Sequence, residues 1–369
     1  MGKARYIMVG GFLGAGKTTA LLRLAERLRG RGLRVGLITN DQSVGLVDTA
    51  VLAARDLPVE EITGGCFCCR FTSLTEAAEK LSRADRPDVF LAEPVGSCTD
   101  LMATVSYPLR RLYGDDFAIA PYSVLVDPVR AERILGLAPG KTFSPKVVYI
   151  YLKQLEEAEL IVVNKVDLLG GPGDRLPRLR AALAERFPKA RLVAMSARVG
   201  TDFDSWAELL DSAELPGGVA MEVDYDTYAD GEALLGWLNL TAAVAGGPFD
   251  GNAYLAGLAA DLHRRLGAAG VEVAHLKMTL SPDQGTDLAV VNLVRTDGRP
   301  EASHWLQEPL EAGELILNLR AEADPEALRA AATGSLKETS LAAGITVDIE
   351  HLEAFRPGRP VPTHRLTRG

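Results

Sequence analysis

Two groups of residues in this sequence have types and spacings that could do chemistry. Three of the four cysteines lie within four positions, as Cys66-Phe67-Cys68-Cys69. A thiolate cluster of this kind suits a soft metal ion. Upstream, Gly11–Thr18 has the Gly-x-x-x-x-Gly-Lys-Thr spacing of a loop that binds a nucleoside triphosphate. The combination predicts a protein that couples a nucleotide to the handling of a metal ion.

The phosphate loop owes its chemistry to its glycines and to the two residues that follow them. Glycines let the backbone wrap closely, with its N–H groups directed at phosphate oxygens. Lys17 is predicted to reach the β- and γ-phosphates, and Thr18 to offer its hydroxyl to Mg²⁺. The helix that begins there adds the positive end of its dipole. The predicted nucleotide contacts in this loop are Gly11, Gly14, Ala15, Gly16, Lys17, Thr18 and Thr19.

A second motif, Asn164-Lys165-Val166-Asp167, follows a predicted strand and favours a guanine base. An aspartate there can accept two hydrogen bonds from the N1–H and the amine of guanine, whereas adenine offers no matching pair and would leave the carboxylate unsatisfied. Ser196 and Ala197 follow the next strand and are predicted to place a backbone amide near the guanine oxygen. The alternative is a surface loop. The predicted base-side residues are Asn164, Lys165, Asp167, Ser196 and Ala197.

Hydrolysis would need a carboxylate that orients the attacking water or a Mg²⁺-bound water. Glu93 lies at the end of a predicted strand and is the main candidate; a plain strand-ending turn is the alternative. Gly96 could let the same loop respond to the γ-phosphate. Asp41, after the second strand, is another candidate, although it could equally be a helix N-cap. The predicted catalytic residues are Lys17, Glu93 and Asp41.

The cysteines are predicted to ligate a metal through Cys66, Cys68 and Cys69. Cys66 and Cys68 are two residues apart and can bind one ion, whereas the adjacent Cys68 and Cys69 are expected to point apart. Thiolates favour Zn²⁺, Cu(I) or iron–sulfur species. A structural Cys₄ zinc site would need a second Cys-x₂-Cys, which is missing, so a labile site is favoured. Inert or redox-active cysteines are the alternatives, and Cys98 is either an additional ligand or a small packed residue.

Apolar runs and helical patterns alternate through the first part of the chain. Each apolar run ends in a polar residue, as expected where an open α/β sheet binds its ligands. This order predicts a P-loop NTPase fold with a doubly wound, mostly parallel sheet. The predicted strands are 6–9, 34–39, 89–92, 123–126, 160–163 and 192–195, and the first predicted helix is 18–29.

The pattern changes after residue 212, where a proline- and glycine-rich stretch predicts a linker. Beyond it, strands and helices follow in an order that resembles a ferredoxin-like α+β sandwich with an added strand or turn. The predicted elements there are strands 233–243, 271–280, 288–294, 314–320 and 345–355 and helices 253–266 and 325–343. The predicted division is a nucleotide domain 1–212, a linker 213–221, an α+β domain 222–356 and an irregular tail 357–369.

The overall charge and hydropathy exclude several classes of protein. The net charge is −9, and no lysine or arginine block forms a basic stripe, so nucleic acid is not an expected partner. No apolar run is long enough to span a bilayer, and no signal peptide is expected at the N-terminus. We therefore expect a cytoplasmic protein, in which clustered cysteines bind metal or act in redox chemistry instead of forming disulfides.

Together these motifs resemble the CobW-like GTPases, relatives of the nickel-chaperone GTPases of hydrogenase and urease maturation. The resemblance covers residues 4–212 and rests on four stretches in matching order. It implies GTP hydrolysis, dependence on Mg²⁺, and delivery of a metal, with Zn²⁺ or Co²⁺ as the expected cargo, to a client metalloprotein or cofactor-assembly enzyme. Nucleotide-dependent homodimers are also implied. The four stretches are Gly10–Thr19, Gly65–Cys69, Glu93–Gly96 and Asn164–Asp167.

The sequence departs from the family pattern in two places. The family usually has Asn-Glu-Phe-Gly-Glu after the second strand, but here Val44 replaces the second acidic residue, and Asp48 is the nearest acidic alternative. The second half also lacks the histidine-rich tracts of several zinc-linked members. Two other functions stay open: a regulatory GTPase that acts on a corrinoid or other metalloenzyme without carrying metal, and, less favoured, a small-molecule kinase.

Overall fold

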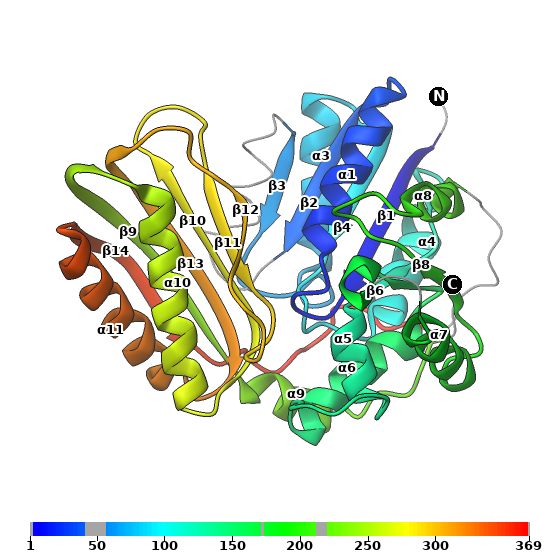
Figure 1. Ribbon diagram of the computed structural model, residues 1–369. Coiled ribbons are helices and arrows are strands. Elements are labelled where there is room, and N and C mark those ends of the chain that lie inside the picture. The colour runs from blue at the N-terminus through cyan, green and yellow to red at the C-terminus, as the bar shows by residue number, and fades with distance from the viewer. Residues whose placement is uncertain (1–2, 41–56, 171–172, 212–219, 368–369) are drawn as a thin grey trace. The chain divides into compact units, whose positions relative to one another are not determined.

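The computed structural model describes residues 3–40, 57–170, 173–211 and 220–367. These residues fall into two units (Figure 1). Unit 1 contains the described residues up to Gly231 together with the segment from Arg359 onward, and unit 2 contains Glu232–Gly358. Within the described residues, no helix is long and apolar enough to cross a membrane.

A parallel sheet forms the centre of unit 1. The strand order in this sheet is β3-β2-β4-β1-β6-β7-β8. The short strand β5 also pairs with β1. Every described pairing in the sheet is parallel. The central strands are buried apolar runs, as in sheets covered on both faces. The strands are β1 (Ala4–Gly11), β2 (Val35–Asn40), β3 (Val59–Ile62), β4 (Val89–Glu93), β5 (Phe117–Ile119), β6 (Ser123–Val126), β7 (Leu160–Val163) and β8 (Arg191–Ala194).

Helices connect these strands and bury one face each against the sheet. In α1, for example, Leu21, Leu24 and Leu28 follow the helical repeat and are all buried. The helical elements are α1 (Lys17–Gly30), α3 (Phe71–Ala84), a π-helix (Met102–Ser106), α4 (Tyr107–Tyr113), α5 (Pro128–Ile134), α6 (Pro145–Glu157), a 3₁₀ turn (Val166–Leu169), α7 (Arg175–Arg186), α8 (Phe203–Asp211) and α9 (Tyr225–Leu234), the last of which crosses the boundary between the units.

In its described residues, unit 2 is an antiparallel sheet with two helices packed on it. The strand order is β12-β11-β10-β13-β9-β14, so β14-β9-β13-β10 has the ferredoxin-like arrangement and β11 and β12 extend one edge. The elements are β9 (Leu235–Phe249), α10 (Gly251–Ala268), β10 (Glu272–Pro282), β11 (Ala289–Leu293), β12 (Glu301–His304), β13 (Leu310–Glu322), α11 (Pro325–Ala343) and β14 (Thr346–Phe355). The predicted fold class is therefore confirmed for both halves.

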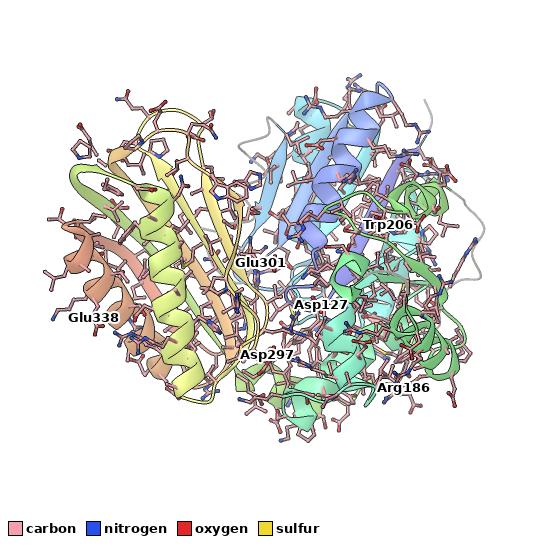
Figure 2. All side chains as sticks on the ribbon, viewed as in Figure 1. Asp127, Arg186, Trp206, Asp297, Glu301 and Glu338 are labelled. Atoms are coloured by element: carbon pink, nitrogen blue, oxygen red, sulfur yellow. The ribbon has the colours of Figure 1, made fainter. Side chains whose placement is uncertain are left out.

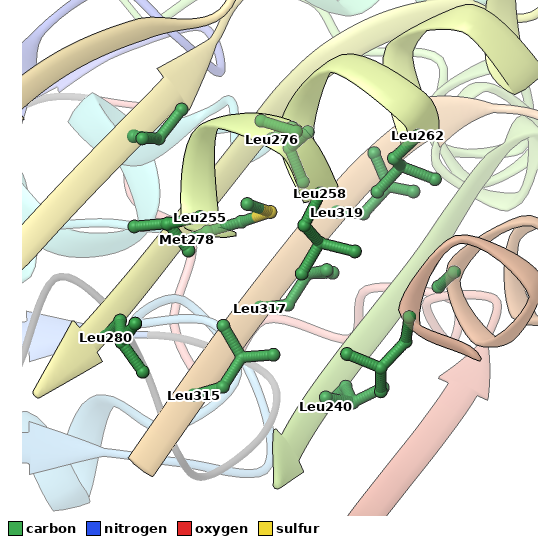
Figure 3. Packing of buried hydrophobic residues seen from close by; sticks show 14 of the residues in the cluster. Leu240, Leu255, Leu258, Leu262, Leu276, Met278, Leu280, Leu315, Leu317 and Leu319 are labelled. Atoms are coloured by element: carbon green, nitrogen blue, oxygen red, sulfur yellow. The ribbon is translucent and has the colours of Figure 1, made fainter. Parts of the chain in front are cut away.

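The core of unit 2 lies between the helices and one face of the sheet. Figure 3 shows leucines of α10 above leucines of β10 and β13. Leu255, Leu258 and Leu262 recur at helical spacing, while Leu315, Leu317 and Leu319 alternate along their strand. All six are 0–1% exposed. The two periodicities meet in one layer, which is why the helices and strands that form this core were predictable from sequence.

Strands β3, β5 and β12 and helix α9 have no counterpart in the sequence prediction, for physical reasons; the helices that connect the strands of unit 1 after α1 were expected only in general, without bounds. Strand β3 carries two glutamates in four residues, and its one partner among the described strands is β2, so it lacks the apolar run of a central strand. Strand β5 has three residues, β12 is exposed at an edge, and α9 has a weak apolar pattern. The predicted linker 213–221 lies mostly outside the described residues, and the proposed domain bounds stay a prediction.

Candidate nucleotide and metal site

The phosphate loop connects β1 to α1 in a backbone conformation that requires glycine. Gly11 and Gly16 have φ of 128° and 89°, which side chains rarely tolerate. A Cβ on Gly11 would lie 2.3 Å from the carbonyl oxygen of Leu125, and one on Gly16 would lie 2.6 Å from Nδ2 of Asn164. Among the described residues no side chain caps the N-terminus of helix α1, so the first N–H groups of this helix suit an anion. The loop thus has the form that a triphosphate requires.

Lys17, Thr18 and Glu93 converge beside this loop. Oγ1 of Thr18 donates to Oε1 of Glu93 at 3.2 Å, and Nζ of Lys17 lies 3.8 Å from the same oxygen. All three residues are buried. A hydroxyl and a carboxylate at this distance are the oxygen donors that Mg²⁺ prefers, so the residues fit that ion. The other predicted catalytic residue, Asp41, lies outside the described residues, as do Val44 and Asp48.

The Asn164 motif supports the phosphate loop as well as the predicted base pocket. Nδ2 of Asn164 donates to the carbonyl of Ala15 at 2.9 Å, and Nζ of Lys165 donates to the carbonyl of Gly14 at 2.6 Å. Lys165 adopts a left-handed conformation, with φ of 56°, which is uncommon for a residue other than glycine and often marks a functional site. The structure therefore brings the two sequence motifs together.

Asp167 and the loop after β8 lie on the predicted base side. Oδ2 of Asp167 is 3.3 Å from Nη2 of Arg198, whose side chain is 58% exposed. The amide of Ala197 donates to Oδ1 of Asn164, and the amide of Ser196 donates to the carbonyl of Thr201. Both amides thus have partners within the protein in this structure. Their role in lining the base pocket stays a prediction.

The three clustered cysteines bring their sulfur atoms together. The Sγ distances are 2.7 Å for Cys66–Cys68, 3.2 Å for Cys66–Cys69 and 3.6 Å for Cys68–Cys69. The expectation that Cys68 and Cys69 point apart is wrong, because residues 67–70 form turns and not an extended strand. Thiolates at about 2.3 Å from a tetrahedral zinc ion would be about 3.8 Å apart. The cluster fits such an ion after its sulfur atoms separate by up to about 1 Å.

Hydrogen bonds within the cluster concentrate negative charge on one thiol. Bonds from Cys68, Cys69 and Cys98 lower the pKa of Cys66 well below the usual thiol value. The bond to Cys66 raises the pKa of Cys68 well above that value, with burial adding to the effect. The bond to Cys66 also raises the pKa of Cys69, to about 11. Cys98 thus contacts the cluster through Cys66, but it does not belong to the three-sulfur group of potential ligands found in the described residues.

The family model of the CobW/HypB/UreG nucleotide-binding domain matches residues 5–193. The chain belongs to this family. The prediction of a CobW-like P-loop GTPase of the metallochaperone type is therefore confirmed at the level of the family.

Individual members of the CobW/HypB/UreG family cover different shares of this chain. The zinc chaperone CobW of a Sinorhizobium species is 29% identical over 258 residues, which are 62% of this chain and 72% of that protein. The zinc chaperone YeiR of Escherichia coli K12 is 32% identical over 164 residues, 43% of this chain and 46% of YeiR. The solved structure of HypB from Helicobacter pylori in complex with nickel is 16% identical, covers 60% of this chain and 92% of that chain, and has a TM-score of 0.43.

Two buried residues of this CobW/HypB/UreG member were missed as site residues by sequence reasoning. Asp127, labelled in Figure 2, follows β6. It caps α5 by accepting from the amide of Arg130, and its Oδ2 lies 3.1 Å from Nζ of Lys165. Asn40, the last residue of β2, holds the cysteine loop. Each residue is the polar residue at the end of an apolar run. This position was the feature of the sequence that could have identified both as site residues.

The side chain of Asn40 makes three hydrogen bonds, one to the end of β3 and two to the cysteine motif. Its Nδ2 donates to the carbonyls of Ile62 at 3.0 Å and Gly65 at 2.7 Å, and its Oδ1 accepts from the amide of Phe67 at 2.8 Å. Because the side chain is 7% exposed, water cannot easily replace these bonds. Asn40, at the end of β2, therefore positions the loop that carries the cysteines.

Proposed function

We propose that this chain is a GTP-hydrolysing zinc chaperone in which the nucleotide state controls zinc binding at Cys66, Cys68 and Cys69. Two relatives named zinc chaperones, CobW and YeiR, support zinc as the cargo. The sulfur donors support a soft or borderline metal ion. Cobalt has no comparable support in these similarities.

The observation that carries this proposal is the segment from Glu93 to Cys98. At one end, Glu93 contacts Lys17 and Thr18 of the phosphate loop. At the other end, the thiol of Cys98 hydrogen-bonds to Cys66. Cys98 is the fifth residue after Glu93, so one short segment connects the predicted γ-phosphate site with the thiolate cluster.

The middle of this segment also contacts the phosphate loop. A Cβ on Gly96 would lie 3.1 Å from the backbone nitrogen of Leu13, so the two backbones approach closely. Helix α6 supports the segment from the other side, since Nε2 of Gln154 donates to the carbonyls of Gly96 at 2.9 Å and Cys98 at 2.8 Å. A shift of the phosphate loop would therefore move the segment, and with it the partner of Cys66.

The residues of the nucleotide site have distinct roles in the proposed hydrolysis. The loop amides and Lys17 bind the β- and γ-phosphates, and Thr18 with Glu93 holds the magnesium side of the site. When bound, Mg²⁺ would neutralise charge that develops on the phosphate oxygens. Lys17 must exchange its contact with Glu93 for the γ-phosphate, which leaves that carboxylate to orient the attacking water. Asp167 accepts the two donors of guanine once Arg198 moves aside.

We further propose a cytoplasmic setting, a client metalloprotein or cofactor-assembly enzyme, and a homodimer that forms with GTP. A reducing compartment would keep the four free cysteines available for metal. Light scattering with GDP and with a non-hydrolysable GTP analogue tests the dimer. A constant monomer mass in both states would remove the dimer from the proposal and leave the zinc cycle unaffected.

The decisive experiment measures zinc affinity in the two nucleotide states. Anaerobically purified protein is titrated with zinc in competition with a chromophoric chelator, in the presence of the GTP analogue or of GDP. Coupling requires two different affinities, and zinc must change the affinity for the analogue by the same factor. Lys17→Ala should lose the difference, and the triple variant C66S/C68S/C69S should lose the site.

The outcomes separate the two functions that the sequence left open. Equal zinc affinities in both states would contradict the coupling. If the wild-type protein binds no zinc or cobalt, and the triple serine variant hydrolyses GTP at the normal rate, the chain is instead a regulatory GTPase that carries no metal. Turnover of ATP equal to that of GTP would favour the small-molecule kinase.

A further inference from the structure

The segment 359–367 returns to unit 1 and lies against the cysteine motif. The backbone N–H of Val361 donates to Sγ of Cys69 at 3.2 Å. The N–H of Thr363 donates to the carbonyl of Cys68 at 2.8 Å, and its hydroxyl donates to the carbonyl of Cys69 at 3.1 Å. The segment is about 290 residues away in sequence, so no local pattern predicts these contacts.

We propose that this segment is part of the metal site, with the N–H of Val361 holding Cys69 in position to bind the ion. The inference rests on the proposed function, because it assigns a new positioning group to the same site. Hydrogen bonds to ligand atoms orient them and tune the metal, and their removal typically costs 10- to 100-fold in affinity. Here the donor comes from the backbone.

The prolines on either side of Val361 limit which backbone N–H can reach Cys69. Pro360 and Pro362 have no backbone N–H, so Val361 carries the only one in the run Pro360–Pro362. Prolines also favour an extended backbone, which reduces the entropy lost when the run binds to the motif. The Val361 side chain is 71% exposed, so packing of that side chain does not explain why the run lies here.

An ion pair fixes the other end of the segment. Nε of Arg365 lies 2.7 Å from Oδ2 of Asp100, a carboxylate that is 1% exposed and that also accepts from the hydroxyl of Tyr225 at 2.7 Å. Nη2 of Arg365 donates to the carbonyl of Met221 at 2.7 Å. Asp100 follows Cys98 by two residues, so the ion pair attaches the segment to the same stretch of chain that contacts Cys66.

The π-helix provides a third attachment. In a π-helix the carbonyl of Ala103 would accept from the amide of residue 108, but residue 108 is a proline. The N–H of Leu366 donates to this carbonyl at 2.8 Å and satisfies it. The ring of His364 packs edge-on against Phe71, with centroids 4.9 Å apart. The segment therefore has contacts along its whole length.

The first part of the test needs no metal. Amide hydrogen exchange in the segment is measured on the wild type, on Arg365→Ala, and on the control Arg359→Ala, which removes only the exposed ion pair with Asp226. The amides of Val361, Thr363 and Leu366 should be protected in the wild type and the control, and should exchange at least about tenfold faster in Arg365→Ala. Fast exchange in the wild type, or equal exchange in all three proteins, would overturn the proposal.

The second part measures metal binding by zinc titration and by the absorption of bound Co²⁺. Val361→Pro removes the N–H and keeps the backbone extended, whereas Val361→Ala keeps the N–H. Val361→Pro should weaken zinc binding by about tenfold or more and shift the thiolate-to-cobalt absorption band, while Val361→Ala should match the wild type. Unchanged affinity and absorption in Val361→Pro would refute the role of the N–H. If the wild type binds neither ion, the proposed function fails and this inference fails with it, whereas docking of the segment is still decided by the exchange data.

Discussion

The hydroxyl of Thr18 and the carboxylate of Glu93 lie 3.2 Å apart, although 75 residues separate them in sequence. They meet because β1 and β4 are parallel neighbours, so the loops at their carboxyl ends lie at the same edge of the sheet. Lys17 completes this group at 3.8 Å from Glu93. This arrangement of Lys17, Thr18 and Glu93 gives the Glu93 carboxylate a role in GTP hydrolysis. That role can be measured separately from nucleotide binding.

Glu93→Gln should lower GTP turnover by about 10²-fold or more while changing nucleotide affinity little. The amide keeps the size of the side chain and can still contact Thr18, but it cannot act as a base or as a charged ligand. Single-turnover hydrolysis and equilibrium binding of a fluorescent GTP analogue measure the two effects. Lys17→Ala is the comparison, and it should lose both hydrolysis and tight binding. A turnover near wild type in Glu93→Gln would exclude Glu93 from the chemical step.

Asp167→Asn should change base selectivity. The aspartate accepts two donors of guanine, and loss of one charged hydrogen bond costs about 1.5–3 kcal/mol, or roughly 10- to 100-fold in GTP affinity. An asparagine donates as well as accepts, so it suits xanthine, which has an oxygen where guanine has its amine. Competition of GTP and xanthosine triphosphate for the site measures the change.

Arg198→Ala is the matched control for the base pocket. It removes the present partner of Asp167, at 3.3 Å, without altering the carboxylate, so base selectivity should be retained. Unchanged selectivity in Asp167→Asn would show that the base binds elsewhere.

Asn40→Ala should loosen the cysteine loop and lower the stability of unit 1. The substitution leaves the buried amide of Phe67 and the carbonyls of Ile62 and Gly65 without this partner, and one unsatisfied buried group costs about 1–3 kcal/mol. Thermal unfolding and zinc titration are the measurements. Asn40→Asp keeps the acceptor for Phe67 but places a carboxylate oxygen against the carbonyls of Ile62 and Gly65, so it should destabilise unit 1 as well. If zinc affinity in Asn40→Ala equals that of the wild type, Asn40 does not position the thiols.

Short-range patterns predicted the strand, glycine-rich loop and helix from β1 to α1, because the glycines have a local backbone reason that their spacing reveals. Gly11 and Gly16, for example, have φ of 128° and 89°, which residues with side chains rarely adopt. The rule that ligands bind at the carboxyl ends of parallel strands also indicated Glu93 as a site residue, and the structure brings its carboxylate beside Thr18. Both predictions were possible because each needs only a few neighbouring residues and the regular geometry of a parallel sheet.

Contacts that depend on tertiary structure could not be predicted in the same way. The pairing of Val361 with Cys69 depends on a segment that returns to unit 1 from the far end of the sequence. The meeting of Cys68 and Cys69 was mispredicted because it depends on a turn that leads into α3, confirmed by the amide of Arg70 bonding to the carbonyl of Cys66. Neither the returning segment nor the turn has a periodic signal in the sequence.

The buried carboxyl of Glu157 gives a pH-dependent prediction. Burial raises the pKa of Glu157 well above its usual 4.5, although the carboxyl accepts from the amide of Met102 at 2.9 Å and the hydroxyl of Thr99 at 3.2 Å. Below about pH 4.5 the folded and unfolded states both keep the proton. As the pH rises above that value the unfolded state loses its proton first, so the free energy of unfolding falls until the folded carboxyl also ionises.

Glu157→Gln should therefore stabilise the protein at high pH and not at low pH. The amide has the shape of the neutral acid and cannot ionise, so it avoids a cost of about 1.4 kcal/mol for each unit of pKa shift. Melting temperatures at roughly pH 5 and pH 8 should show a gain for the variant that grows with pH, by about 2–4 °C per kcal/mol. Glu156→Gln is the control on the same helix, because Glu156 is exposed and pairs with Lys153. A gain that is the same at both pH values would mean that Glu157 has an ordinary pKa in the folded protein.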